Sequence, residues 1–235
     1  MSEPATALLS VRGEARATVA PDFVVLSGVL KATAGTKAAA LEIAAAALRR
    51  LTADLGSLGA APMTGDVPDA ALAWLAHSAT TEVEFDHDYE TGRSGPTGRI
   101  HASVAMTVQV RAFELLERLG GVLATHEALS IHHVAWHVDP DNPSWPDVRA
   151  AAIRAAIAKG RDYATALGGS LDRVEHIADV GLLGNEHGSY LREASAAAAF
   201  RSGPEGLPDT PSLDPVPQEL TAIIDARFVA SVAAL

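Results

Sequence analysis

Strict alternation of apolar and polar residues in the last part of the chain is the feature that most constrains its fold. In ELTAIIDARFVASVAAL, residues 219–235, an apolar side chain recurs at every second position from Leu220 to Val232. Successive side chains of a β-strand point to opposite faces of a sheet, whereas a helix repeats every 3.6 residues. The segment therefore predicts a C-terminal strand that packs one face on a core.

The same period of two appears twice in the middle of the chain. TTEVEFDHDYE, residues 80–90, alternates cleanly, and so does RIHASVAMTVQVR, residues 99–111. Between them stands TGRSGPTG, whose glycines, serine and proline are typical of a turn. We predict an antiparallel hairpin here.

Three segments have a helical period instead. Apolar residues recur at steps of three and four in 37–58, after Thr36 as a plausible N-cap, and again in about 112–124. A third helix is expected to begin at a capping box formed by Ser144 and Asp147 and to end at Gly168–Gly169. Its interior carries small residues spaced by four, which lets a helix lie close on a sheet. They are Ala152, Ala156, Gly160 and Ala164.

The remaining segments complete the fold class. Residues 15–34 predict one strand or two, with Pro21 at an edge or bend, and further strands are expected at 131–138 and 172–183. The resulting fold is α+β, an antiparallel or mixed β-sheet with helices packed on one face. We expect a single domain over 1–235. Within it, residues 183–218 hold five prolines and predict a long flexible insertion.

Composition excludes several classes of site and partner. The 235 residues include 18 Lys and Arg against 29 Asp and Glu, a net charge of −11, which argues against nucleic acid and anionic membranes as partners. The absence of cysteine excludes disulfides, thiolate metal sites and a cysteine nucleophile. The first residues lack the pattern of a signal peptide, and no later segment has about 18 consecutive apolar residues. We expect a cytoplasmic protein.

The stretch IHHVAWHVDP, residues 131–140, resembles a metal motif because His133 and His137 are four apart. Apolar and polar positions alternate there, so the segment predicts a strand, and positions four apart on a strand lie about 13 Å from each other. A site would need ligands from other strands, such as His101 or His176. His133, His137 and His101 are therefore the candidate metal ligands, although we expect exposed strand histidines.

An acidic row lies on one face of the first hairpin strand: Glu82, Glu84, Asp86, Asp88 and Glu90. Carboxylates can bind a divalent cation, but successive members of this row are too far apart to share one. We expect a solvated strand face, partly offset by Arg99, His101 and Arg111 on the partner strand. Such charge also discourages unwanted pairing at a sheet edge.

Motifs for nucleophilic or phosphate chemistry are missing from the sequence. There is no G-x-S-x-G elbow, no G-x-x-x-x-G-K-[ST] loop and no G-x-G-x-x-G fingerprint. We therefore predict no catalytic residues, no cofactor-binding residues and no cofactor.

Four blocks of the chain resemble the SIMPL-domain family in their order and spacing. They are SVRGEARATVAPDFVVLSGVL, IHASVAMTVQVRAFELLERLGGVL, VAWHVDPDNPSWPDVRAAAIRAAIAKGRDYATALGGSLDRVEHI and VPQELTAIIDARFVASV. The resemblance implies one fold built from two halves of strands and helices, a tendency to form homo-oligomers, and in many bacterial members export and oxidative-stress tolerance. It supplies no catalytic residue to carry over. This chain departs from the family in its missing export signal, its acidic strand, its histidines and its 183–218 insertion.

These observations favour a non-enzymatic SIMPL-like protein, a self-associating interaction or stress-protective scaffold. We expect a homo-oligomer, with any other protein partner unidentified, and no nucleic acid or membrane partner. Two alternatives stay open. One is a metal-dependent enzyme that uses strand histidines and acidic residues, and the other is a small-ligand-binding protein.

Overall fold

The computed structural model describes residues 5–63, 70–88, 92–180 and 213–233. These residues form two compact units, and the chain passes between them more than once. Unit 1 contains the described residues among 1–19, 140–212 and 217–235, and unit 2 those among 20–139 and 213–216. Each unit has its own sheet, so the two are described separately.

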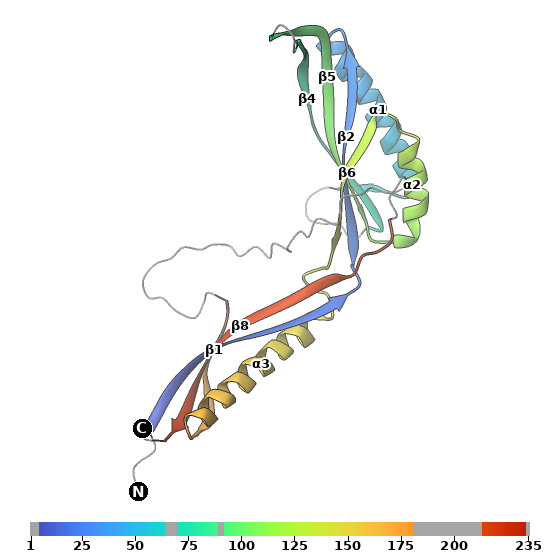
Figure 1. Cartoon of the computed structure of the whole chain (residues 1–235). Helices are drawn as coiled ribbons and strands as arrows, with labels where there is room; N and C mark the ends of the chain where they lie inside the picture. The colour runs from blue at the N-terminus through green and yellow to red at the C-terminus, as the bar shows by residue number, and fades with distance from the viewer. Residues whose placement is uncertain (1–4, 64–69, 89–91, 181–212, 234–235) are drawn as a thin grey trace. The chain divides into compact units, whose positions relative to one another are not determined.

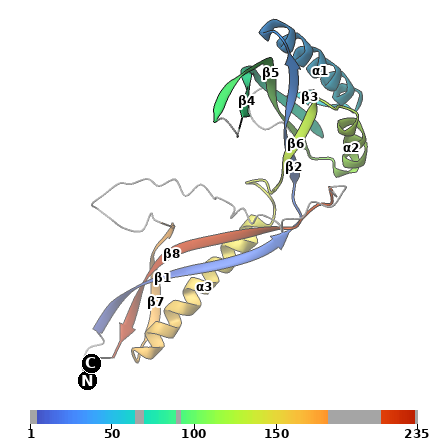
Figure 2. The ribbon, with the colours of Figure 1, turned by 45° about the horizontal axis from the view of Figure 1, so that its top comes forward.

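Unit 1 is a three-stranded antiparallel sheet with one helix. Its strands, in spatial order, are β1 (Ala5–Val19), β8 (Gln218–Val232) and β7 (Ser170–Asp179). β1 and β8 pair along their whole length, from Ala5 opposite Val232 to Val19 opposite Gln218. The helix α3 (Trp145–Ala166) runs along one face of the sheet (Figure 2). Segments from the two ends of the chain are thus paired with each other.

The strand predicted from the C-terminal alternation is confirmed as β8. Leu220, Ile224 and Phe228 are at most 5% exposed, and the alanines between them at positions 222 and 226 are also buried. These residues share the face that α3 covers. The low aromatic content of the chain leaves Phe228 as the largest fully buried side chain.

The stripe of small residues predicted on the third helix is confirmed and is buried against the sheet. Its members are Ala152, Ala156, Gly160 and Ala164. A Cβ added to Gly13 of β1 would lie 2.1 Å from the carbonyl oxygen of Ala152, and one added to Gly160 would lie 3.1 Å from the ring of Phe228. The backbones of helix and strand therefore touch at Gly13, a separation that no larger residue permits.

The C-terminal end of α3 agrees with the predicted Gly168–Gly169 stop. Gly168 has a φ of +72°, and the Gly169 N–H donates to the carbonyl of Ala164 at 2.9 Å. A left-handed residue followed by this bond is a Schellman motif, which satisfies carbonyls left open at a helix end.

The capping box predicted at the start of α3 is wrong. Ser144 has helical angles, φ −79° and ψ −20°, and its side chain makes no capping hydrogen bond. Its own N–H donates to Oδ1 of Asn142 at 2.9 Å. A capping hydroxyl requires an extended backbone at the N-cap, so Ser144 is turned the wrong way for that role.

Unit 2 is a five-stranded sheet with helices on one face (Figure 1). Its strands, in spatial order, are β3 (Ala61–Pro62), β4 (Leu72–Asp88), β5 (Arg93–Val110), β2 (Phe23–Ala34) and β6 (Leu129–His137). β3 pairs with β4 in parallel, and the other pairs are antiparallel. The helices are α1 (Lys37–Ser57), the 3-10 turn η1 (Phe113–Leu115) and α2 (Leu116–Ala124).

The core of unit 2 lies between this sheet and its helices. Leu26 and Leu30 of β2 pack with Leu51 and Leu55 of α1, and all four are at most 1% exposed. Thr36 is the N-cap of α1, as predicted, and its side chain accepts a hydrogen bond from the Ala39 N–H at 3.2 Å. The predicted hairpin is confirmed as β4 and β5, and the predicted helix near 112–124 as η1 and α2.

The predicted fold class is confirmed: the chain is α+β, with antiparallel and mixed sheets and helices on one face of each. Of the predicted 183–218 insertion, residues 183–212 lie outside the described residues, and β8 begins at Gln218. None of the helices that the structure describes is long and apolar enough to cross a membrane.

Replacing Gly13 by alanine should destabilise unit 1 by about 1–3 kcal/mol, because the added methyl group overpacks the contact with α3. The free energy of unfolding in urea, followed by circular dichroism, measures the effect. Gly35→Ala is the matched control, since a Cβ at Gly35 meets no atom within 4 Å. Equal stability of the wild type and Gly13→Ala would contradict the backbone contact.

Candidate functional site

The histidines of the HHVAWH stretch lie on a strand, as their alternation predicts. His133 stands opposite Ser27 of β2, and His137 stands opposite Phe23. The intervening Val134 and Trp136 pack on the core of unit 2, so His133 and His137 belong to the opposite face of the sheet. Their spacing is therefore that of a strand and not that of one helical turn.

His101, the third candidate ligand, lies far from this pair. It lies on β5, opposite Thr33 of β2, and its Nδ1 is 2.8 Å from Oγ1 of Thr33. Thr33 and Ser27 are six positions apart on β2, which corresponds to about 20 Å along the strand. His101 therefore does not reach His133 within this unit.

The described residues contain no group of three or more His, Asp or Glu side chains placed to hold a metal ion. His176, the other histidine considered as a ligand, lies on β7 of unit 1. Within unit 2, His133, His137 and His101 therefore do not form a shared metal site.

The acidic row on β4 is less regular than its sequence suggests. The pairing of β4 with β5 shifts between Val83 and Phe85, where Glu84 alone lies opposite three residues of β5, 97–99, so β5 bulges there. Glu84 lies 3.4 Å from Arg99 Nε and 3.7 Å from His101 Nε2, and it accepts a hydrogen bond from Thr97 at 2.9 Å. Arg99 and His101 therefore offset the row at this bulge, as predicted.

Arg111 was expected to offset the same acidic row, and that prediction is wrong. Its guanidinium makes a bidentate pair with Asp139, with Nη1 2.6 Å from Oδ2 and Nη2 3.0 Å from Oδ1. Both side chains are about four-fifths buried. Arg111 follows the last residue of β5, whereas the acidic row pairs with the first part of that strand, so the two lie at opposite ends of the hairpin.

Asp139 also joins this pair to the start of β2. Its N–H donates to Oδ2 of Asp22 at 2.7 Å, and the N–H of Asp22 donates to the carbonyl of His137 at 2.8 Å. We call Asp22, Arg111 and Asp139 the junction cluster. Asp22 lies two residues after the chain enters unit 2, and Asp139 is the last residue before the chain leaves it.

An aromatic stack lies against the junction cluster. The rings of Phe23 and His137 are parallel within 15°, with centroids 4.9 Å apart, and the Arg111 guanidinium carbon is 4.7 Å from the Phe23 centroid. The second contact is a cation–π interaction. Arg111 thus satisfies a carboxylate and covers a ring at once, a combination that suits arginine and not lysine.

Electrostatics agree with this geometry. The hydrogen bond from Arg111 and its positive charge hold the pKa of Asp139 below its ordinary value, against the opposing effect of burial. Burial lowers the pKa of His137, and the nearby His133 lowers it further. His137 is therefore a neutral ring at pH 7. The junction cluster beside it, with its paired Arg111 and Asp139, is suited to holding the chain in place.

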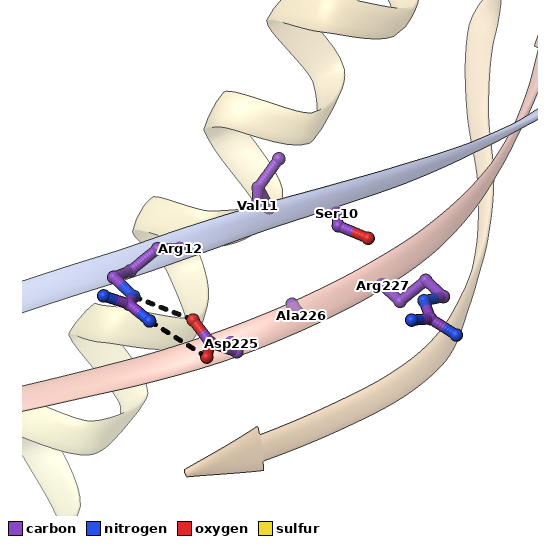
Figure 3. Close-up of a pocket in the computed structure, with 6 residues that line it drawn as sticks. All are labelled: Ser10, Val11, Arg12, Asp225, Ala226 and Arg227. Atoms are coloured by element: carbon purple, nitrogen blue, oxygen red, sulfur yellow. Dashed lines mark hydrogen bonds and ion pairs between the residues drawn. The ribbon is translucent and has the colours of Figure 1, made fainter. Parts of the chain in front are cut away.

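Unit 1 carries a shallow hollow on the sheet face away from α3, about 380 Å³ in volume (Figure 3). Its lining residues are Ser10, Val11, Arg12, Asp225, Ala226 and Arg227. Arg12 donates to both carboxylate oxygens of Asp225, at 2.8 and 3.1 Å. Sequence reasoning missed this pair because 213 positions separate its members, and only the register of β1 on β8 brings them together.

The model of the SIMPL family, described as proteins of unknown function (DUF541), matches residues 9–228. The chain belongs to the SIMPL family. The SIMPL match takes in residues of both units. No curated protein matches the chain.

The junction cluster unites the sequence blocks that resemble the SIMPL family. Asp22 comes from the first block, Arg111 from the second and Asp139 from the third. These three residues are about 90 and 30 positions apart in the chain, but they meet through two hydrogen-bonded contacts. In this SIMPL protein the Pro-Asp and Asp-Pro pairs thus mark the places where the chain enters and leaves unit 2.

Asp139→Asn should lower the free energy of unfolding by about 1.5–3 kcal/mol at pH 7, because a buried charge-assisted pair is lost. The folded-state pKa of Asp139 lies below its unfolded value, so the wild-type pair stabilises above about pH 4 and is lost as pH falls through the folded value. The difference between wild type and variant in urea should therefore shrink below pH 4. Glu14→Gln, which removes an exposed pair with Arg16, is the control and should change little. A difference independent of pH would contradict the assignment.

His133→Asn should raise the pKa of His137, because it removes a nearby positive charge while the burial of His137 is unchanged. The raised value should still lie below the ordinary value for histidine. Proton NMR titration of the imidazole signals measures it. His132→Asn, one position away on the same strand, is the control and should leave His137 unchanged. Equal shifts of the His137 pKa in both variants would exclude the placement of His133 and His137 on one face of β6.

Proposed function

We propose that this SIMPL protein is a non-enzymatic, self-associating interaction scaffold of the cytoplasm, with a stress-protective role. The proposal also takes the two units as one functional domain, within which the family match is continuous. The observation that carries it is the exposure of apolar side chains on the edge strands of both sheets.

Each sheet ends in strands with an open side. In unit 1 these are β1 and β7, and in unit 2 they are β6 and most of β4, because β3 covers β4 only at Ala73 and Trp74. An open strand edge presents unpaired N–H and C=O groups, which pair readily with another strand. No strand among the described residues pairs along these open sides.

Each of these edge strands carries large apolar side chains that are more than a third exposed. They are Leu8 on β1, Leu75, Val83 and Phe85 on β4, Ile131 on β6, and Val174 and Ile177 on β7. Phe85 is the most exposed of them, at 63%. Apolar surface gains about 25 cal/mol for each Å² removed from water. Association along the edges would bury this surface and satisfy the backbone groups together.

The charge of the chain indicates the kind of partner. A net charge of −11 disfavours the phosphates of nucleic acids and anionic membranes. It does not prevent pairing between copies, because exposed acids on the strands stand near cations, as Glu84 does beside Arg99. We therefore infer that the main partner is a second copy of the chain.

Sedimentation equilibrium of the untagged protein tests this function. We expect a mass several times 24.3 kDa that rises with protein concentration. Ile43→Ser, which removes an exposed apolar residue of α1 away from every sheet edge, is the control and should associate like the wild type. A protein that stays monomeric up to high concentration would refute the scaffold.

A further inference from the structure

β7 is the edge strand of unit 1 with the more accessible outer side. β8 occupies one side of β7, and no described strand pairs with the other. The opposite edge strand, β1, is engaged by α3, whose Lys159 donates to the carbonyl of Arg12 at 2.9 Å. A lysine placed at an edge opposes the addition of another strand.

Two bulges sort the side chains of β7 onto its faces. The pairing with β8 shifts between Leu171 and Arg173 and again between Val174 and His176. As a result Leu171, Val174 and Ile177 stand opposite the β8 residues at 230, 228 and 226, which face α3. Three apolar residues spaced by three therefore share one face of β7.

Four charged residues in the middle of β7 lie on the other face. Asp172 accepts a hydrogen bond from Ser231 at 2.6 Å, and Glu175 lies 3.8 Å from Arg227. Arg173 and His176 stand opposite the β8 residues at 229 and 227, on the same side. Acidic and basic residues thus alternate along this face of β7, in the order Asp172, Arg173, Glu175 and His176.

α3 leaves the apolar face of β7 largely uncovered. The helix is held down by backbone contact at Gly13 of β1 and by its contact with Phe228 of β8. Val174 is therefore 47% exposed and Ile177 42% exposed, although their β8 neighbours are buried. An apolar strip beside an open strand edge results.

The sequence of β7 is complementary to itself when it is read in the antiparallel direction about Val174. In that register Arg173 stands opposite Glu175 of a second copy, and Asp172 stands opposite His176. On the other face Leu171 stands opposite Ile177, and Val174 meets itself. Every pair joins residues of one face. A shift by one residue would place Asp172 opposite Ile177. Both the charge pairs of one face and the apolar pairs of the other would then be lost.

We propose that β7 pairs antiparallel with β7 of a second copy, centred on Val174, so that two three-stranded sheets become one six-stranded sheet. This inference rests on the self-association proposed above and names the surface that carries it. The apolar strips of the two copies then lie side by side on the face that carries the two α3 helices. Two Arg–Glu pairs and two Asp–His pairs lie on the opposite face.

Disulfide trapping tests the register, because the chain has no cysteine of its own. In the proposed pairing the Cβ atoms at position 174 of the two copies are about 5 Å apart, within reach of a disulfide after small adjustments. Val174→Cys should form a covalent dimer under mild oxidation at least about tenfold faster than Ile43→Cys, an exposed control on α1. Leu171→Cys alone should not, but mixed with Ile177→Cys it should give the heterodimer.

A charge exchange tests the same register without oxidation. Arg173→Glu places glutamates opposite each other twice and should weaken association by about tenfold or more, since like charges directly opposite are destabilising. The double variant Arg173→Glu, Glu175→Arg should restore it. Arg173→Glu mixed with Glu175→Arg should associate better than either alone. Circular dichroism verifies that each variant is folded.

The outcomes separate this inference from the proposed function. If the wild type associates but Val174→Cys is trapped no faster than Ile43→Cys, the β7 pairing is refuted and the scaffold function stands. If the wild type is monomeric at every concentration, both are refuted. Failure of the double variant to recover association would refute the register centred on Val174.

Discussion

The contact between the backbones of α3 and β1 at Gly13 is the constraint on which unit 1 depends. A helix can approach this closely only where both surfaces lack side chains, and here Gly13 meets Ala152 and Ala156. The contact places α3 over β1 and β8. β7, the third strand, consequently keeps Val174 exposed, so the feature that closes the core of unit 1 also leaves the surface through which we propose that copies associate.

Unit 2 is organised by a polar constraint instead. Arg111 binds Asp139, and Asp139 in turn binds Asp22, so that the residues at which the chain enters and leaves the unit are held together. Because the pair is largely buried, removing one member leaves the other without its partner, which is more costly than losing an exposed pair. In this chain a structural role in unit 2 thus falls to the Pro-Asp pair, to the arginine after β5 and to the Asp-Pro pair.

Local patterns in the sequence predicted the elements, and long-range contacts could not be read from it. The alternation of apolar and polar residues predicted the strand around Phe228, and the spacing of small residues predicted that α3 packs closely on the sheet. Each of these patterns repeats within one segment of the chain. The partner of Arg111 depends on where a distant loop returns, and the bulge of β5 opposite Glu84 depends on how two strands pair. Ser144 does not act as a cap because its backbone is already helical, with its N–H bound by Asn142, and composition alone does not rank such neighbouring side chains.

Hydrogen exchange along β7 at low and high protein concentration tests the central claim most directly, that this SIMPL protein assembles through an open sheet edge. Amides of 171–177 that β8 leaves unpaired should exchange rapidly in dilute solution. At high concentration they should become protected, while the buried amides around Leu220 stay protected at both. Exchange of 171–177 that is independent of concentration, in a protein shown to associate, would contradict assembly through β7.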